Sequence, residues 1–411
     1  MGNVLEWYDF GCFGFFAVII GRHFFPSDDP FTSLLSAFGA FAAGYLARPI
    51  GALALGHIGD KLGRKTAMTL VISVMGAATV GIGLLPGYDT IGVAAPIALV
   101  LLRLLQGFAV AGEYSTSTVF LIEHAPVERR GYVSSWSTFG QFVGLILGSG
   151  VGALVSSLLT EAQVDAWGWR VPFLLSVIIT GLGFYYRAGI TESPAMEDSE
   201  AQHGSPVVEA VRTEWKTIFI YLCMIVMTGV GWFVAYVYAV NDLTSRMHVS
   251  TAKALDINTL ALFGILVVTP FAGLLSDKIG RKPLAIFAAV GTGVLALPLW
   301  WLIHHENSIY IIIGQLTFAV LFAVGWAVYA VMMVEILSPR VRCTVISIGN
   351  GIAYGVFGGL TPLIATYLVE RTSDDYAPVY LLMVMALISF VATLTVPETL
   401  KRVRGRQSET P

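Results

Sequence analysis

The chain is 411 residues long, and 56% of its residues are hydrophobic while only 12% are charged. Soluble domains carry about twice that share of charged residues, so the composition argues against a water-soluble fold and favours a protein embedded in a bilayer. The formal net charge of −3 leaves no large basic surface for a nucleic acid, and we expect no nucleic-acid partner.

Long apolar stretches alternate with polar breaks along the whole chain. A helix needs about 20 apolar residues to cross the hydrocarbon core of a bilayer. Twelve stretches of about that length predict twelve transmembrane helices, at residues 4–25, 32–58, 65–85, 93–123, 131–158, 169–189, 216–241, 253–276, 283–304, 308–335, 342–370 and 378–396. The expected fold class is therefore an all-α membrane protein.

One break is longer and more polar than the others. Residues 191–215 form this break, and their last part, 207–215, could form a short helix at the membrane interface. We expect an N-terminal six-helix half at 1–190, a cytoplasmic linker at 191–215, a C-terminal six-helix half at 216–398 and a cytoplasmic tail at 399–411.

The basic residues predict the orientation of the chain. With the N-terminus placed inside, most of the 24 Lys and Arg residues fall in the inner segments between helices. Because cytoplasmic loops carry the excess of Lys and Arg, both termini are expected in the cytoplasm.

An internal repeat relates the two halves. Residues 56–65 (GHIGDKLGRK) and 273–282 (GLLSDKIGRK) are identical at six of ten positions, and each follows the second helix of its half. Residues 123–130 and 335–342 form a second, looser pair after the fourth helices. Six helices separate the copies, and this even number predicts two parallel halves, with substrate held between them near the midplane.

Several motifs resemble those of one transporter family. The repeated GxxxDKxGRK loop and the fourth-helix segment at 103–113 resemble the signatures of the major facilitator superfamily. A narrower set is similar to the metabolite:proton symporters, which include proline/betaine, α-ketoglutarate, citrate and shikimate permeases: LEWYDF (5–10), FFP (24–26), RP (48–49), QGF (106–108), GEY (112–114), WGWRVP (167–172) and GLTP (359–362). The resemblance covers nearly the whole chain and implies the major facilitator fold and secondary transport.

The repeated loops predict an inner gate. An aspartate at a helix end can cap a neighbouring helix or pair with a basic side chain across the bundle, and such contacts would break as the inner side opens. The alternative is that the basic residues only anchor the topology. The candidate gate residues are Asp60, Arg64, Arg129, Arg130, Asp277 and Arg281.

Ionisable side chains within the predicted helices are concentrated in the first half. Such groups are costly in a membrane and are functional candidates for that reason. Counting about 1.5 Å of rise per residue places Glu6, Asp9, Arg48 and Glu113 in one layer of the inner half. We predict a buried carboxylate–arginine network there that couples transport to protons; the alternative is a static structural network.

A second set of residues could bind substrate. Arg103 lies near the middle of its predicted helix and could hold a carboxylate with its two-pronged guanidinium, or could instead brace helices 1 and 4. Aromatic faces could hold a quaternary ammonium or a ring, although helix packing is the simpler explanation for any single one. The other candidates are Tyr8, Gln106, Trp136, Gln141, Trp232, Tyr236, Trp326, Tyr329 and Asn350.

These patterns predict a proton-coupled symporter that imports a small carboxylate-bearing metabolite, a mono- or dicarboxylate or a zwitterion such as proline or betaine, by alternating access. We expect no enzyme activity, no metal site and no cofactor beyond the coupling proton. The chain should be a monomer in the bacterial inner membrane. An efflux antiporter or an uncoupled facilitator is the alternative within transport, and a membrane receptor is a remote one.

Overall fold

The computed structural model describes residues 2–192, 205–245, 247, 249 and 251–401, which fold into helices joined by short turns with no β-strand among them. The chain divides into two compact units. Unit 1 comprises residues 1–117 and 140–197, and unit 2 comprises 118–139 and 198–411. The predicted boundaries of the halves stay a prediction. Most of the predicted linker (193–204) and tail (402–411) lie outside the described residues.

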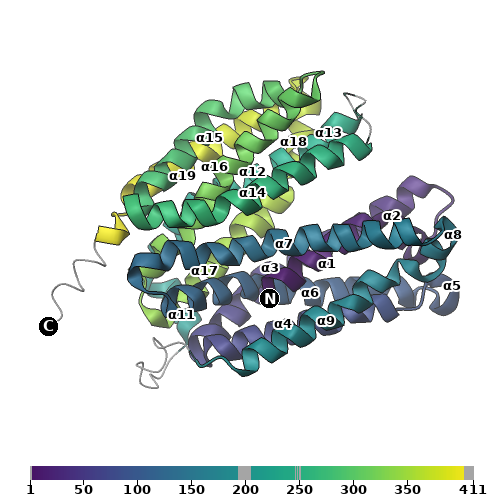
Figure 1. Ribbon diagram of the computed structural model, residues 1–411, viewed down its shortest axis with the longest axis horizontal. Coiled ribbons are helices and arrows are strands. Elements are labelled where there is room, and N and C mark those ends of the chain that lie inside the picture. The colour runs from purple at the N-terminus through teal and green to yellow at the C-terminus, as the bar shows by residue number, and fades with distance from the viewer. Residues whose placement is uncertain (1, 193–204, 246, 248, 250, 402–411) are drawn as a thin grey trace. The chain divides into compact units, whose positions relative to one another are not determined.

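The first part of the chain forms eleven helical segments (Figure 1). They are α1 (Gly2–Phe15), α2 (Ala17–Phe24), α3 (Pro30–Lys61), α4 (Arg64–Leu84), α5 (Tyr88–Ile91), α6 (Ala94–His124), η1 (Val127–Arg129), α7 (Arg130–Leu158), α8 (Glu161–Gln163), η2 (Val164–Gly168) and α9 (Arg170–Ala188). These segments belong to unit 1, except that residues 118–139, at the end of α6, in η1 and at the start of α7, belong to unit 2.

The second part of the chain begins with a short helix at the position where the sequence suggested one (Figure 1). Its segments are α11 (Pro206–Thr213), α12 (Trp215–Trp232), η3 (Phe233–Tyr238), α13 (Ala239–Ser245), α14 (Thr251–Ile279), α15 (Arg281–Ile303), α16 (Ser308–Ile336), η4 (Pro339–Val341), α17 (Arg342–Asn350), η5 (Gly351–Gly358), α18 (Gly359–Thr372) and α19 (Ala377–Thr395).

The structure confirms that the predicted membrane spans are long apolar helices, and their number is close to the predicted twelve. Among the described residues, eleven helices are long and apolar enough to cross a membrane, and the number rises to twelve if the bent pair α1 and α2 is one span. The interior of an α-helix satisfies its own backbone polar groups, which is the condition for crossing hydrocarbon. The protein is a multi-pass membrane protein.

The first predicted helix, 4–25, is not continuous. It divides into α1 and α2, whose axes differ by 72°, and Phe16 at the break leaves helical geometry with φ −98° and ψ 12°. The turns before the break contain Gly11 and Gly14, and glycine is among the weakest helix formers. The hydropathy pattern continues through the bend and therefore did not reveal it.

Two other predicted helices contain π-helical segments that the sequence did not indicate. These segments are η3, between α12 and α13, and η5, between α17 and α18. A π-helical turn inserts an extra residue into the ladder and rotates the side chains that follow, and such turns are frequent at functional sites.

Glycines bring the helices of unit 1 into backbone contact. A Cβ added at Gly107 of α6 would lie 1.7 Å from the carbonyl oxygen of Gly44 in α3, and one added at Gly148 of α7 would lie 2.2 Å from that of Tyr8 in α1. Small residues permit this close approach between membrane helices. These contacts set the positions of α1, α3 and α6, which carry the intramembrane charges.

We predict that Gly107→Ala destabilises the protein by about 1–3 kcal/mol, because the added methyl group forces α3 and α6 apart. The thermal unfolding midpoint of the purified protein in detergent measures the effect. Gly181→Ala is the matched control, since a Cβ at that position of α9 meets nothing within 4 Å. Equal midpoints for the two variants would contradict this packing.

Candidate functional site: buried charges and inner helix ends

A buried ion pair joins α1 to α6 in unit 1. Arg103 Nη1 donates to Asp9 Oδ2 at 2.5 Å and to Gln106 Oε1 at 2.7 Å. The Gln106 amide nitrogen donates to Asp9 Oδ1 and to Thr79 Oγ1 of α4, both at 2.8 Å. Asp9, Arg103, Gln106 and Thr79 thus form one polar network that links α1, α4 and α6.

The surroundings of this network are apolar. Asp9 and Arg103 are 1% and 2% exposed, and the Arg103 guanidinium lies 3.6 Å from the ring centre of Phe13. Removing one partner of such a pair leaves an uncompensated buried charge, which costs several kcal/mol. The two charges therefore depend on each other, and a proton added to Asp9 would disturb the whole network.

A second buried ion pair involves a residue nearer the C-terminal end of α6. Glu113 Oε1 accepts a hydrogen bond from Arg187 Nη2 of α9 at 2.7 Å, and Arg187 also donates to the carbonyl oxygen of Met68. The sequence pattern did not single out Arg187, because it lies at the end of a predicted helix among the basic residues that set topology. Its burial could be recognised only from the fold.

The ion pairs of the structure do not join Glu6, Asp9, Arg48 and Glu113 to one another, and their predicted role in proton coupling stays a prediction. Asp9 pairs with Arg103 and Glu113 pairs with Arg187, while Arg48 lies against the rings of Tyr45 and Phe10. The sequence left Arg103 open as a cation for substrate or as a brace between predicted helices 1 and 4, and its pairing with Asp9 agrees with the second interpretation.

The N-terminal ends of α4 and α15 are built in the same way in the two units. Each helix follows a glycine with positive φ, Gly63 at 99° and Gly280 at 109°, a conformation that L side chains rarely adopt. The first amides of α4 donate to the carboxylate of Glu192, and those of α15 donate to that of Glu398. A carboxylate at this position complements the positive end of the helix dipole.

The two candidate gate aspartates occupy equivalent places in this construction. Asp60 pairs with Arg64 at 3.2 Å, and Asp277 pairs with Arg281 at 2.6 Å. Both arginines are fully buried. The arginine of each repeat is therefore a buried ion-pair partner in addition to any role in topology.

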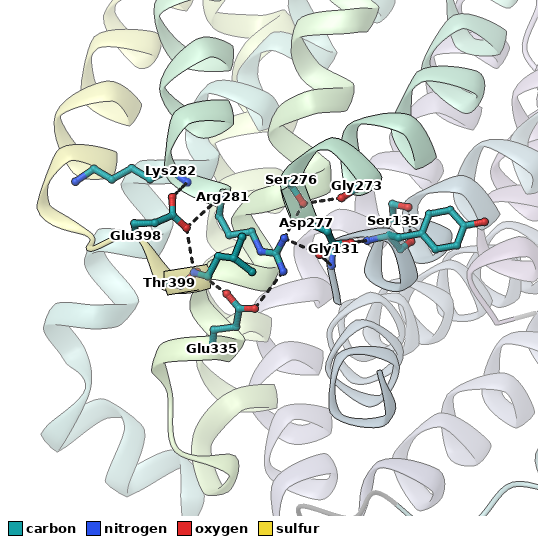
Figure 2. Close-up of polar contacts among 12 residues, drawn as sticks. Gly131, Ser135, Gly273, Ser276, Asp277, Arg281, Lys282, Glu335, Glu398 and Thr399 are labelled. Carbon is teal, nitrogen blue, oxygen red and sulfur yellow. Dashed lines mark hydrogen bonds and ion pairs between the residues drawn. The ribbon is translucent and has the colours of Figure 1, made fainter. Parts of the chain in front are cut away.

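In unit 2 the aspartate also caps a neighbouring helix, as Figure 2 shows. The two carboxylate oxygens of Asp277 accept from the backbone N–H groups of Gly131 and Tyr132 at 2.9 and 2.8 Å, at the start of α7. Arg281 also reaches Glu335 at 3.3 Å, and Thr399 donates to the same carboxylate. One aspartate therefore holds α7, α14 and α15 together.

The two remaining gate candidates directly precede Gly131 in the chain. Arg129 is exposed in η1, and Arg130 is half-buried at the start of α7. A further pair that sequence reasoning missed joins Glu123 of α6 to Arg342 of α17 at 2.9 Å. The looser repeat at 123–130 and 335–342 could have indicated this pair, because Glu123 is the first residue of one copy and Arg342 is the last residue of the other.

The aromatic candidates of unit 2 form one group. The ring centres of Trp232 and Tyr236 are 5.2 Å apart, and those of Trp232 and Trp326 are 6.1 Å apart. The Trp326 indole donates to the hydroxyl of Tyr354 at 2.8 Å, and that hydroxyl lies 2.9 Å from Thr228 Oγ1. Sequence reasoning missed Tyr354 and Thr228; the π-helix η5, which carries Tyr354, left no recognisable signal.

The polar candidates around this group differ in their contacts. Tyr236 donates its hydroxyl to the carbonyl oxygen of Gln315, whereas the buried hydroxyl of Tyr329 has no hydrogen-bond partner among the described residues. Asn350 accepts from the Tyr221 hydroxyl at 3.2 Å through its Oδ1.

Three further candidates lie elsewhere. Tyr8 is buried and donates to the carbonyl oxygen of Pro172, so its hydroxyl braces α1 against α9. Trp136 is 43% exposed and contacts the rings of Tyr132 and Phe139, and Gln141 is half-buried on α7. Within the described ranges, no group of three or more His, Cys, Asp or Glu side chains is placed to hold a metal ion.

Comparison with known proteins places these features in a family. The model of the sugar (and other) transporter family matches residues 1–196 and again 196–404. The chain is 34% identical to the proline/betaine transporter of Escherichia coli K12 over 98% of this chain and 83% of that protein. It is equally identical to the glycine betaine/proline/ectoine/pipecolic acid transporter OusA of Dickeya dadantii, over 97% and 82%.

A solved structure confirms the fold. The proton:xylose symporter XylE of the major facilitator superfamily, bound to 6-bromo-6-deoxy-D-glucose, superposes with a TM-score of 0.80 at 18% identity, over 98% of this chain and 96% of that one. The chain therefore has the major facilitator fold. The chain belongs to the sugar (and other) transporter family of that superfamily; it is a transporter and not an enzyme.

We predict that Asp277→Ala destabilises the protein by about 3–5 kcal/mol, because it leaves Arg281 without one of its two carboxylates and uncaps α7. Thermal unfolding in detergent measures the loss. Asp256→Ala on the same helix, where the side chain is exposed, is the control and should leave the midpoint unchanged. A similar midpoint for both variants would show that the inner cluster adds little stability.

Proposed function

We propose that the protein is a proton-coupled symporter that imports a small carboxylate-bearing metabolite by alternating access. The single observation that carries this proposal is the buried Asp9–Arg103 pair with Gln106 and Thr79. A carboxylate held in an apolar interior by one arginine changes its interactions strongly when it binds a proton. Because the network joins three helices, protonation of Asp9 would be felt by α1, α4 and α6 together.

A zwitterion such as proline or betaine is the substrate class that we favour. The two relatives described above, each 34% identical to this chain, have proline and betaine in their names. The aromatic group around Trp232 and Trp326 supplies ring faces that attract a quaternary ammonium. The transported molecule would pair this cationic part with a single carboxylate.

The location and the gate complete the proposal. The protein would lie in the bacterial inner membrane as a monomer, with both termini in the cytoplasm, as the distribution of Lys and Arg indicates. The inner ends of α4 and α15, with their buried Asp–Arg pairs and glutamate caps, would stabilise the closed inner side. Opening of that side would have to break some of these contacts.

The experiment that tests this function is uptake into proteoliposomes under an imposed proton gradient. The panel of radiolabelled substrates contains proline, betaine, α-ketoglutarate, citrate and shikimate. Accumulation of proline or betaine driven by an inward gradient, and abolished by a protonophore, is the expected result. Export under the same gradient would indicate an antiporter, and equilibration without accumulation would indicate an uncoupled facilitator.

We predict that Asp9→Asn abolishes proton-driven accumulation but retains exchange of substrate between the two sides. The amide is neutral, like the protonated acid, and can still accept from Arg103, so the carrier should cycle without moving a proton. Counterflow and gradient-driven uptake, measured on the same vesicles, separate the two activities.

Asp89→Asn, in the exposed turn of α5, is the control for this substitution and should behave like the wild type. Accumulation by Asp9→Asn at the wild-type level and with the wild-type pH dependence would remove Asp9 from the coupling mechanism.

A further inference from the structure

Arg48 differs from the other buried arginines of unit 1. Arg64 pairs with Asp60, Arg103 with Asp9 and Arg187 with Glu113, each at 3.2 Å or less. Arg48 is 91% buried, since 9% of its surface is exposed, yet it forms no ion pair with a described residue. A buried guanidinium that forms no ion pair is costly, so its retention calls for an explanation.

Aromatic rings hold the guanidinium of Arg48 in place. Its central carbon lies 4.1 Å from the ring centre of Tyr45 and 5.4 Å from that of Phe10. The Phe10 ring in turn contacts Trp7 and Tyr45, at 5.7 and 6.0 Å. Contact with ring faces stabilises the cation but uses none of its N–H donors, which point outward along the edge of the planar group.

Two N–H donors on one edge of the Arg48 guanidinium, Nε and Nη2, are buried without a hydrogen-bond partner among the described residues. These two nitrogens point in the same direction and form the fork that binds both oxygens of a carboxylate. The rings of Trp7, Phe10 and Tyr45 are only partly buried, so the group is not sealed from the surface of unit 1.

The nearby carboxylates do not fill this fork. Glu6 lies near enough to interact electrostatically with Arg48, but no ion pair joins the two, and Glu113 is already bound to Arg187. Arg103, the cation that the sequence favoured, donates through Nη1 to both Asp9 and Gln106. Arg48 therefore presents a carboxylate-binding edge that the resident charges leave unused.

We infer that Arg48, held against Tyr45 and Phe10, binds the carboxylate of the transported molecule through Nε and Nη2. The inference rests on the proposed function and assigns its carboxylate subsite. Arg103 keeps its place as the partner of Asp9, so carboxylate binding and the Asp9 network use different arginines. A ligand that lacks a carboxylate should gain nothing from Arg48.

Glycine betaine and choline provide the matched probes for this assignment. Both carry a trimethylammonium group, but only betaine has a carboxylate. Binding to the purified full-length chain in detergent is measured by thermal stabilisation over a range of ligand concentrations, which yields an apparent affinity. The wild-type protein should bind betaine well and choline weakly.

Arg48→Gln should weaken betaine binding at least about tenfold and leave choline binding unchanged, because only the charge-assisted contacts are lost. Arg48→Lys should also bind betaine less tightly, since an ammonium cannot form the two-pronged contact. Arg22→Gln, on an exposed arginine that pairs with Asp165, is the control and should match the wild type. If Arg48→Gln does not fold, the lysine variant provides the measurement.

The possible failures are distinguishable. If the Arg48 variants bind betaine as the wild type does, or lose betaine and choline equally, the carboxylate assignment is wrong while the proposed function stands. If the wild-type protein responds to no carboxylate ligand of the uptake panel, the proposed function fails and the inference falls with it.

Discussion

A charge buried within a membrane protein is costly unless it is paired inside the protein, and the Asp9–Arg103 pair meets this constraint in unit 1. The pair cannot form unless α1 and α6 lie close together, and the glycine contacts of α6 with α3 and of α7 with α1 make that closeness possible. Gln106 then extends the network to Thr79 of α4. Packing and charge are thus mutually dependent, and a change in the protonation of Asp9 has direct structural consequences.

The two units build the N-terminal ends of α4 and α15 alike but differ in their interiors. In both, a glycine with positive φ, a buried arginine and a capping glutamate define the start of a helix, and the internal repeat encodes this construction. Unit 1 additionally buries the Asp9 and Glu113 pairs within its helices, whereas the described buried charges of unit 2 lie near helix ends. The interior of unit 2 instead has aromatic rings and hydroxyl groups. We infer a division of labour in which unit 1 handles charge and unit 2 supplies apolar and aromatic surface.

The sequence predicted the class of fold, the spans and the repeated loops because these depend on hydropathy and on residues that are close in the chain. It could not predict which arginine pairs with which carboxylate. That choice depends on tertiary packing. The Glu113–Arg187 pair was missed, and the Asp9–Arg103 contact was open only as the alternative in which Arg103 braces helices 1 and 4. Tyr354 was missed for a related reason, since the π-helical segment that carries it follows from tertiary packing. The glutamate caps, Glu192 and Glu398, lie far along the chain from the helices that they cap.

The central claim is that binding of the substrate and protonation of a buried carboxylate in unit 1 are linked. The most direct test is to add betaine to the purified protein in weakly buffered detergent solution and to follow the pH with an indicator dye. The account predicts net proton uptake that saturates with betaine binding and is absent from Asp9→Asn. Saturable betaine binding by the wild-type protein with no proton uptake at any pH would contradict it.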